Sequence, residues 1–201
     1  MKGTDADYWR ARTYTTYTSE GWDTLAEWGE FEESGADDLA RVKSTHEFNV
    51  VAATDTLFHA GLAAEFDRPI EALTTTEIPD DALQIRFTEG REFFPTRTNL
   101  NYTASGNATT TNAATLRRFD GPIPAEILKT YTQLPETLPR RVDRLAAEIA
   151  AGHETVFDKA HAIEAYVKSF PYNLDIAAPP EGQDGVDYFL FDLRQGYCDY
   201  Y

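Results

Sequence analysis

The chain has 201 residues, of which 42% are hydrophobic and 13% aromatic, enough apolar material for one ordinary domain or two small ones. This composition excludes a disordered chain, a collagen-like repeat and a coiled coil. Its 18 basic and 34 acidic residues give a formal net charge of −16, which argues against binding to nucleic acid or to an anionic membrane surface. We therefore expect a folded chain with no nucleic-acid partner and no direct membrane contact.

The excess of acidic residues is large enough that surface charges repel one another, and salt would screen this repulsion. The basic residues are 13 Arg and only 5 Lys. Two interpretations stay open: the surface of a halophile's protein, or an ordinary acidic bacterial domain. Dialysis to low salt would distinguish them.

The first part of the chain is rich in strand patterns. Residues 8–18 alternate polar with apolar side chains and contain many aromatic and β-branched types, which predicts a strand. The stretch 19–38 has eight acids and no base, and it predicts a solvated loop or edge. Residues 41–60 predict further strand, and residues 78–94 predict a strand pair around Gly90.

A long stretch dominated by Thr and Asn follows, from residue 95 to 115, and predicts a polar loop or an exposed edge strand. Helical patterns begin after residue 120. A short helix is predicted over 124–131, with proline in its first turn. Apolar residues at three- and four-residue spacing predict a second helix over 139–151, with Gly152 as its C-cap, and a third over 155–170.

A single cysteine, Cys198, excludes an intrachain disulfide and a thiolate metal cluster. The four histidines are scattered without ligand spacing, so we predict no metal site and no cofactor. No stretch is long and apolar enough to cross a bilayer, and residues 1–5 lack an apolar signal core. The sequence therefore indicates a soluble piece, and a membrane-anchored parent protein remains compatible with it.

Cys198 is the candidate nucleophile. A lone cysteine is more often a small buried side chain than a catalytic one, so the case for catalysis depends on the residues around Cys198. Gly196 permits a close backbone approach just before it. A helix that begins at Cys198 would direct its N-terminal amides at the sulfur and stabilise the thiolate. This arrangement favours a reactive thiol.

The stretch 187–201, Asp-Tyr-Phe-Leu-Phe-Asp-Leu-Arg-Gln-Gly-Tyr-Cys-Asp-Tyr-Tyr, resembles the active-site cysteine segment of the transglutaminase-like superfamily, especially its prokaryotic membrane-anchored members. Residues 138–149, 158–164 and 170–172 resemble the two helices and the extended tyrosine segment that precede that cysteine. More loosely, residues 8–22 resemble the extracytoplasmic β domain of such proteins.

This resemblance implies a fold, a location and an activity. We expect an α+β chain with a β-rich N-terminal domain over residues 1–120 and the helical first half of a papain-like core over residues 121–201. The domain would lie on the extracytoplasmic face of the membrane. Cys198 would attack a peptide or protein carboxamide, form a thioester, and pass the acyl group to an amine or to water.

In the family the histidine and aspartate of the triad follow the cysteine by several tens of residues, so we expect the chain to be an inactive segment of a longer protein. His153 and His161, in the helical part, are predicted to be solvated or capping rather than catalytic, and His46 and His59 are weaker candidates still. A non-catalytic extracytoplasmic binding module on a degenerate scaffold is the alternative. A histidine and an aspartate in the parent sequence would favour the enzyme.

Overall fold

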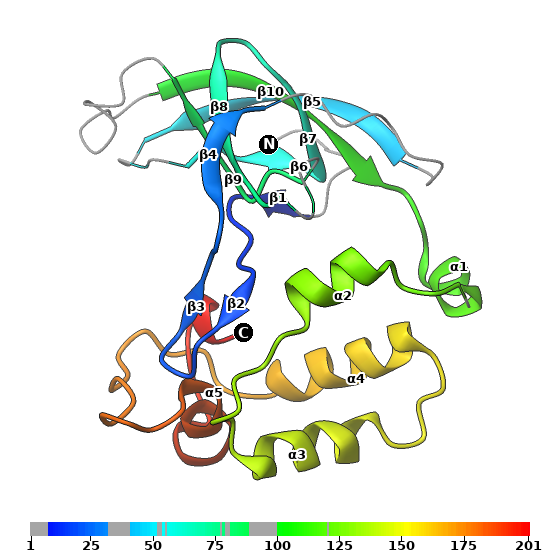
Figure 1. Cartoon of the computed structure of the whole chain (residues 1–201), viewed down its shortest axis with the longest axis vertical. Helices are drawn as coiled ribbons and strands as arrows, with labels where there is room; N and C mark the ends of the chain where they lie inside the picture. Colours follow the sequence, from blue (N-terminus) through cyan, green and yellow to red (C-terminus); the bar gives the residue numbers. More distant parts are fainter. Residues whose placement is uncertain are drawn as a thin grey trace. The chain divides into compact units, whose positions relative to one another are not determined.

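The computed structural model describes residues 8–31, 41–51, 54, 56–76, 78, 81–88, 100–119 and 121–201. The chain forms two compact units, which we call the β unit and the helical unit. The β unit comprises Met1–Thr15, Thr24–Thr111 and Ala125–Thr130, and the helical unit comprises Thr16–Asp23, Asn112–Pro124 and Tyr131–Tyr201. Figure 1 shows most strands in the first unit and most helices in the second. The predicted α+β class is confirmed.

Antiparallel pairings build the β unit. One three-stranded sheet has the order β5 (Arg41–Val50), β10 (Leu100–Thr109), β7 (Leu62–Phe66). The other has the order β4 (Glu27–Glu30), β8 (Ile70–Thr74), β9 (Gln84–Phe87). The short strands β1 (Trp9–Arg10) and β6 (His59–Ala60) pair with each other, and the unit also includes most of helix α2 (Ala125–Tyr131). Its core residues are Leu57, Ala63, Ala72, Ala82, Ile85, Phe87, Tyr102 and Ala104.

Strand β10 shows that the prediction of a polar loop or an edge strand over 95–115 is wrong for residues 100–109, because β10 lies between two other strands. Tyr102, Ala104, Gly106 and Ala108 are buried at two-residue spacing, so one face of the strand belongs to the core. Most of these inward side chains are small, and the hydrophobic signal is therefore weak. Residues 95–99 lie outside the described part of the chain.

The acid-rich stretch 19–38 contains β3 (Trp22–Asp23) and β4. Among the described strands β4 has one neighbour and a largely exposed surface, so the predicted edge is confirmed there, whereas residues 32–38 lie outside the description. Strand β9 lies within residues 78–94, where a strand pair is predicted. The predicted turn of that pair, at Gly90, lies outside the described residues. No pattern predicted β7 and β8, because Ala and Glu have low strand propensity.

His59 is a buried histidine of the β unit, 1% exposed, and its Nδ1 has no hydrogen-bond partner among the described residues. Burial, followed by the charge of Arg10, lowers its pKa from 6.5 to about 4. The unfolded chain therefore takes up this proton near pH 6.5 and the folded chain near pH 4. The resulting stability is fully present above pH 6.5 and is lost as the pH falls toward 4, by about 3 kcal/mol in total.

We expect His59→Gln to remove this contribution, because glutamine does not titrate. Urea unfolding at a series of pH values gives the unfolding free energy as a function of pH. Between pH 6.5 and 4 its slope against pH should be smaller in the variant, by the amount that corresponds to about one bound proton. Equal slopes in the two proteins would contradict the assignment.

The helical unit begins with the hairpin strands β2 (Thr16–Tyr17) and β3, and its helices come later in the chain. These are α1 (Ala113–Arg118), α3 (Arg140–Ala150), α4 (Val156–Val167), α5 (Gly185–Asp187), the π-helix η2 (Tyr188–Leu193) and the 3₁₀-helix η3 (Cys198–Tyr200).

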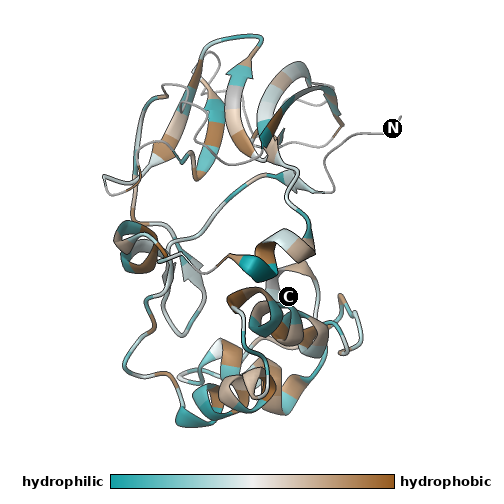
Figure 2. Cartoon of the chain, turned by 90° about the vertical axis from the view of Figure 1, so that its right-hand side faces the viewer, coloured by the Kyte–Doolittle hydropathy of each residue, from teal (hydrophilic) through white to brown (hydrophobic). Residues whose placement is uncertain are grey.

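Helices α3 and α4 confirm the predicted helices over 139–151 and 155–170, and α2 confirms the helix over 124–131. Thr155 caps α4, since its hydroxyl accepts the Asp158 N–H at 3.0 Å, and Gly152 adopts φ 82° after α3. Figure 2 shows hydrophobic and hydrophilic residues alternating around these helices. The apolar faces of α3 and α4 pack on a core of Phe170, Phe189 and Leu190.

Candidate functional site

A run of helix leads to Cys198. Asp184 caps the start of α5, where its Oδ1 accepts the Asp187 N–H at 2.9 Å. The chain then passes without a break into the π-helix η2. Arg194 ends η2 in the left-handed conformation at φ 51°. Because π-helices are rare and frequently occur at functional sites, this local geometry marks the segment before the cysteine.

Gly196 lies against an extended segment of the same unit. It forms a parallel bridge with Tyr172, donates its N–H to Pro171 O at 3.2 Å, and accepts the Asn173 N–H at 2.7 Å. A Cβ on Gly196 would lie 2.9 Å from the Cβ of Tyr200, closer than such atoms approach. The predicted close backbone approach before the cysteine is therefore confirmed, and glycine is required there.

Cys198 is exposed and is the first residue of η3. Tyr197 before it is extended, and the Tyr200 N–H donates to Tyr197 O at 2.9 Å, which closes one turn. The backbone thus bends into a single helical turn that begins at the cysteine. The thiol is accessible to a molecule in solution.

An aromatic cluster lies beneath this turn. The ring of Phe189 lies 5.4 Å from that of Phe170 and 5.5 Å from those of Tyr200 and Tyr201. The Tyr201 hydroxyl donates to Phe170 O at 3.1 Å or Pro171 O at 2.9 Å. These contacts join η3 to the end of α4 and to η2, so the position of the cysteine depends on the packing of Phe189.

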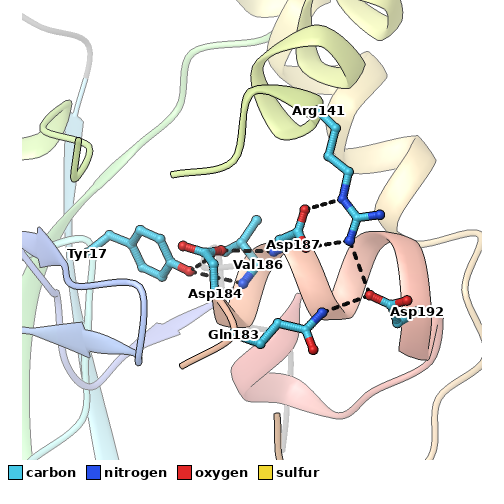
Figure 3. A network of polar contacts seen from close by, with 7 residues as sticks. All are labelled: Tyr17, Arg141, Gln183, Asp184, Val186, Asp187 and Asp192. Carbon is cyan, nitrogen blue, oxygen red and sulfur yellow. Dashed lines mark hydrogen bonds and ion pairs between the residues drawn. The ribbon is translucent and has the colours of Figure 1, made fainter. Parts of the chain in front are cut away.

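A polar network holds the other side of the helical run (Figure 3). The Arg141 guanidinium of α3 binds both oxygens of the buried Asp187 and also reaches Asp192 at 3.2 Å. Asp192 in turn accepts a hydrogen bond from Gln183 at 2.9 Å. Hydrogen bonds from Arg141 hold the pKa of Asp187 below its usual value, so this carboxylate stays ionised.

Sequence reasoning did not find this network, because residues 177–185, which lead into it, are rich in Pro, Gly and acids and show no helical pattern. One signal was present: Asp184 followed three residues later by Asp187 is a capping pattern. The long-range partner Arg141 has no local signal.

The histidines occupy different places. His161 is exposed on α4, where its ring stacks on Phe157 at 6.0 Å and lies 3.3 Å from Glu164. His153 is exposed after α3, where its N–H donates to Ala150 O. Both positions are the solvated or capping ones that the sequence predicts. His46 and His59 belong to the β unit.

Within the described ranges, no three or more His, Cys, Asp or Glu side chains are grouped so as to hold a metal ion. No described helix has the length and apolar character that crossing a membrane requires.

Comparisons with known proteins give two similar proteins. The uncharacterized protein YebA of Bacillus subtilis (strain 168) is 43% identical over 72 residues, which are 34% of this chain and 10% of YebA. The crystal structure of the periplasmic domain of TgpA from Pseudomonas aeruginosa, bound to ethylmercury, superposes with a TM-score of 0.52 at 22% identity. The superposition covers 96% of this chain and 62% of the TgpA chain, so the two share a fold and this chain spans less than two thirds of either relative. No family model matches the chain.

Proposed function

We propose that the chain carries the nucleophile of a transglutaminase-like cysteine acyltransferase or amide hydrolase, and that Cys198 is that nucleophile. The observation that carries the proposal is the geometry at Cys198: an exposed thiol at the first residue of a helical turn, two residues after a glycine that the packing requires. The resemblance of residues 187–201 to the family's cysteine segment supports it, as does the shared fold with TgpA, a transglutaminase-like protein.

In the proposed reaction the Cys198 sulfur attacks the carbon of a peptide or protein carboxamide. The carbon–nitrogen bond then breaks, ammonia leaves with a proton, and a thioester remains on the sulfur. An amine or water next attacks the thioester and restores the thiol. The Cys198 backbone N–H would donate to the oxyanion formed in both steps, and such donors contribute strongly to lowering the barrier.

The family resemblance places a histidine and an aspartate after the cysteine in chain order. Residues 1–201 would then hold one of the three catalytic groups, and a thiol without its base is a poor nucleophile at neutral pH. We therefore expect residues 1–201 alone to give no turnover. An extracytoplasmic location forms part of the proposal, and it is supported by the periplasmic location of the TgpA domain.

The test uses the whole protein, incubated with a glutamine-containing peptide and a fluorescent primary amine. We expect incorporation of the amine or release of ammonia, and loss of both in Cys198→Ser. One equivalent of ethylmercury should inhibit the reaction and be found on Cys198 by mass spectrometry, because thiolates bind soft metals.

The matched control is residues 1–201 in the same assay, which should be silent. Turnover that survives Cys198→Ser would refute the assignment of the nucleophile. Peptide binding without any turnover would favour the binding module instead.

A further inference from the structure

The hairpin β2–β3 comes from the N-terminal part of the chain, yet it belongs to the same compact unit as Cys198. Its turn is tight: the Thr18 N–H donates to Gly21 O at 2.9 Å, and Ser19 adopts φ 67°. The Ser19 hydroxyl lies 3.0 Å from that of Thr137. The hairpin is therefore anchored to the helical unit by its tip.

The hairpin also completes the start of α5. The first N–H groups of a helix have no partner within the helix and need one from elsewhere. The Gly185 N–H donates to Ser19 O at 2.7 Å, and the Val186 N–H donates to the Tyr17 hydroxyl at 3.0 Å. The third, that of Asp187, is bound by the Asp184 cap. Two of these three partners thus come from the hairpin.

Tyr17 supplies the central contact, visible in Figure 3. Its side chain is 5% exposed, and its hydroxyl donates to Asp184 Oδ1 at 2.8 Å while accepting the Val186 N–H. Burial and the Asp184 carboxylate raise the pKa of Tyr17, so the hydroxyl remains a donor at any physiological pH. One hydroxyl therefore connects the capping side chain with the backbone of the helix that it caps.

The position of α5 is transmitted to the cysteine, because α5 continues directly into η2 and η2 carries Phe189 into the core under η3. We propose that Tyr17 is a positioning residue for Cys198, acting through Asp184 and the helical run α5–η2. This inference rests on the proposed function for its catalytic meaning, and its structural part is tested separately.

The test attaches a trifluoroethylthio group to Cys198, the single cysteine of residues 1–201. The ¹⁹F spectrum of this group is recorded in the unchanged 201-residue chain and in its Tyr17→Phe variant. We expect one narrow resonance in the unchanged protein and a shifted or broadened one in Tyr17→Phe. Amide hydrogen exchange at Val186 should become at least about tenfold faster in the variant, because its acceptor is lost.

Tyr102→Phe is the matched control. Tyr102 is also buried, and its hydroxyl also contacts backbone: it accepts the Phe58 N–H at 2.6 Å and donates to Phe58 O at 3.1 Å. Unlike Tyr17, Tyr102 lies in the β unit. We expect this variant to leave the ¹⁹F signal unchanged. An unchanged signal in Tyr17→Phe, or equal changes in both variants, would overturn the proposal.

If Tyr17→Phe does not fold, amide hydrogen exchange in the unchanged chain tests the proposal. Gly185 and Val186 should then be protected as strongly as the amides of α4, and exchange at the rate of an exposed loop would overturn the proposal. In the whole protein we expect Tyr17→Phe to lower kcat with little change in KM. A protein without any turnover but with a Tyr17-dependent ¹⁹F signal would refute the proposed function and retain the positioning contact, so the two failures are distinguishable.

Discussion

Replacing Gly106 with alanine should lower the unfolding free energy of the β unit by about 3 kcal/mol or more. A Cβ at this position would overlap the backbone oxygen of Ala60 and lie 3.0 Å from the backbone oxygen of Leu62. Strand β10 is held between β5 and β7, so it cannot move away from one neighbour without breaking its ladder with the other. Urea unfolding followed by tryptophan fluorescence measures the loss.

Gly29→Ala is the matched control, because Gly29 also lies in a strand and a Cβ there would meet no described atom within 4 Å. We expect it to change the unfolding free energy by no more than about 0.5 kcal/mol. Equal effects of the two substitutions would show that β10 does not pack closely against β6 and β7 at Gly106.

Phe189→Ala should lower the unfolding free energy of the helical unit by about 3–5 kcal/mol, since it empties a site that is 3% exposed and removes three ring contacts. Circular dichroism at 222 nm, recorded through a denaturant titration, reports on the helices of this unit. We also expect iodoacetamide to alkylate Cys198 at a different rate in Phe189→Ala than in the unchanged chain, because the turn that contains Cys198 packs against the Phe189 ring.

Phe119→Ala makes the same chemical change on a side chain of the helical unit that is 64% exposed. It should cost less than about 0.5 kcal/mol. A comparable loss in the two variants would mean that the aromatic cluster is not the core of the unit.

Helices α2, α3 and α4 could be predicted because each has a local cause. Helices α3 and α4 repeat apolar residues at helical spacing, and Thr155 and Gly152 mark their boundaries by side-chain and backbone chemistry that acts within one turn. Such signals need no knowledge of the rest of the chain. The tight packing at Gly196 was likewise predicted from neighbouring residues, whereas the role of Cys198 as nucleophile stays a prediction.

The sheet was harder to predict, because the position of a strand depends on neighbours far away in sequence. Strand β10 buries Tyr102 and two alanines, which is too little apolar surface to indicate a central strand until β5 and β7 are known. The network of Arg141 and Asp187 is similar, since 46 residues separate its partners. The domain boundary near residue 120, the halophilic surface, and peptide or protein substrates stay predictions.

The hairpin has a consequence for synthesis on the ribosome. Tyr17 and Asp184 are separated by 167 residues, so at a rate of about 5–20 residues per second Tyr17 waits roughly ten to thirty seconds for its partner. During that time all strands of the β unit except β1, which precedes the hairpin, emerge on its C-terminal side and can pair among themselves. The hairpin must therefore remain undocked while its neighbours in sequence fold, and the helical unit closes only when the segment before Cys198 has been made.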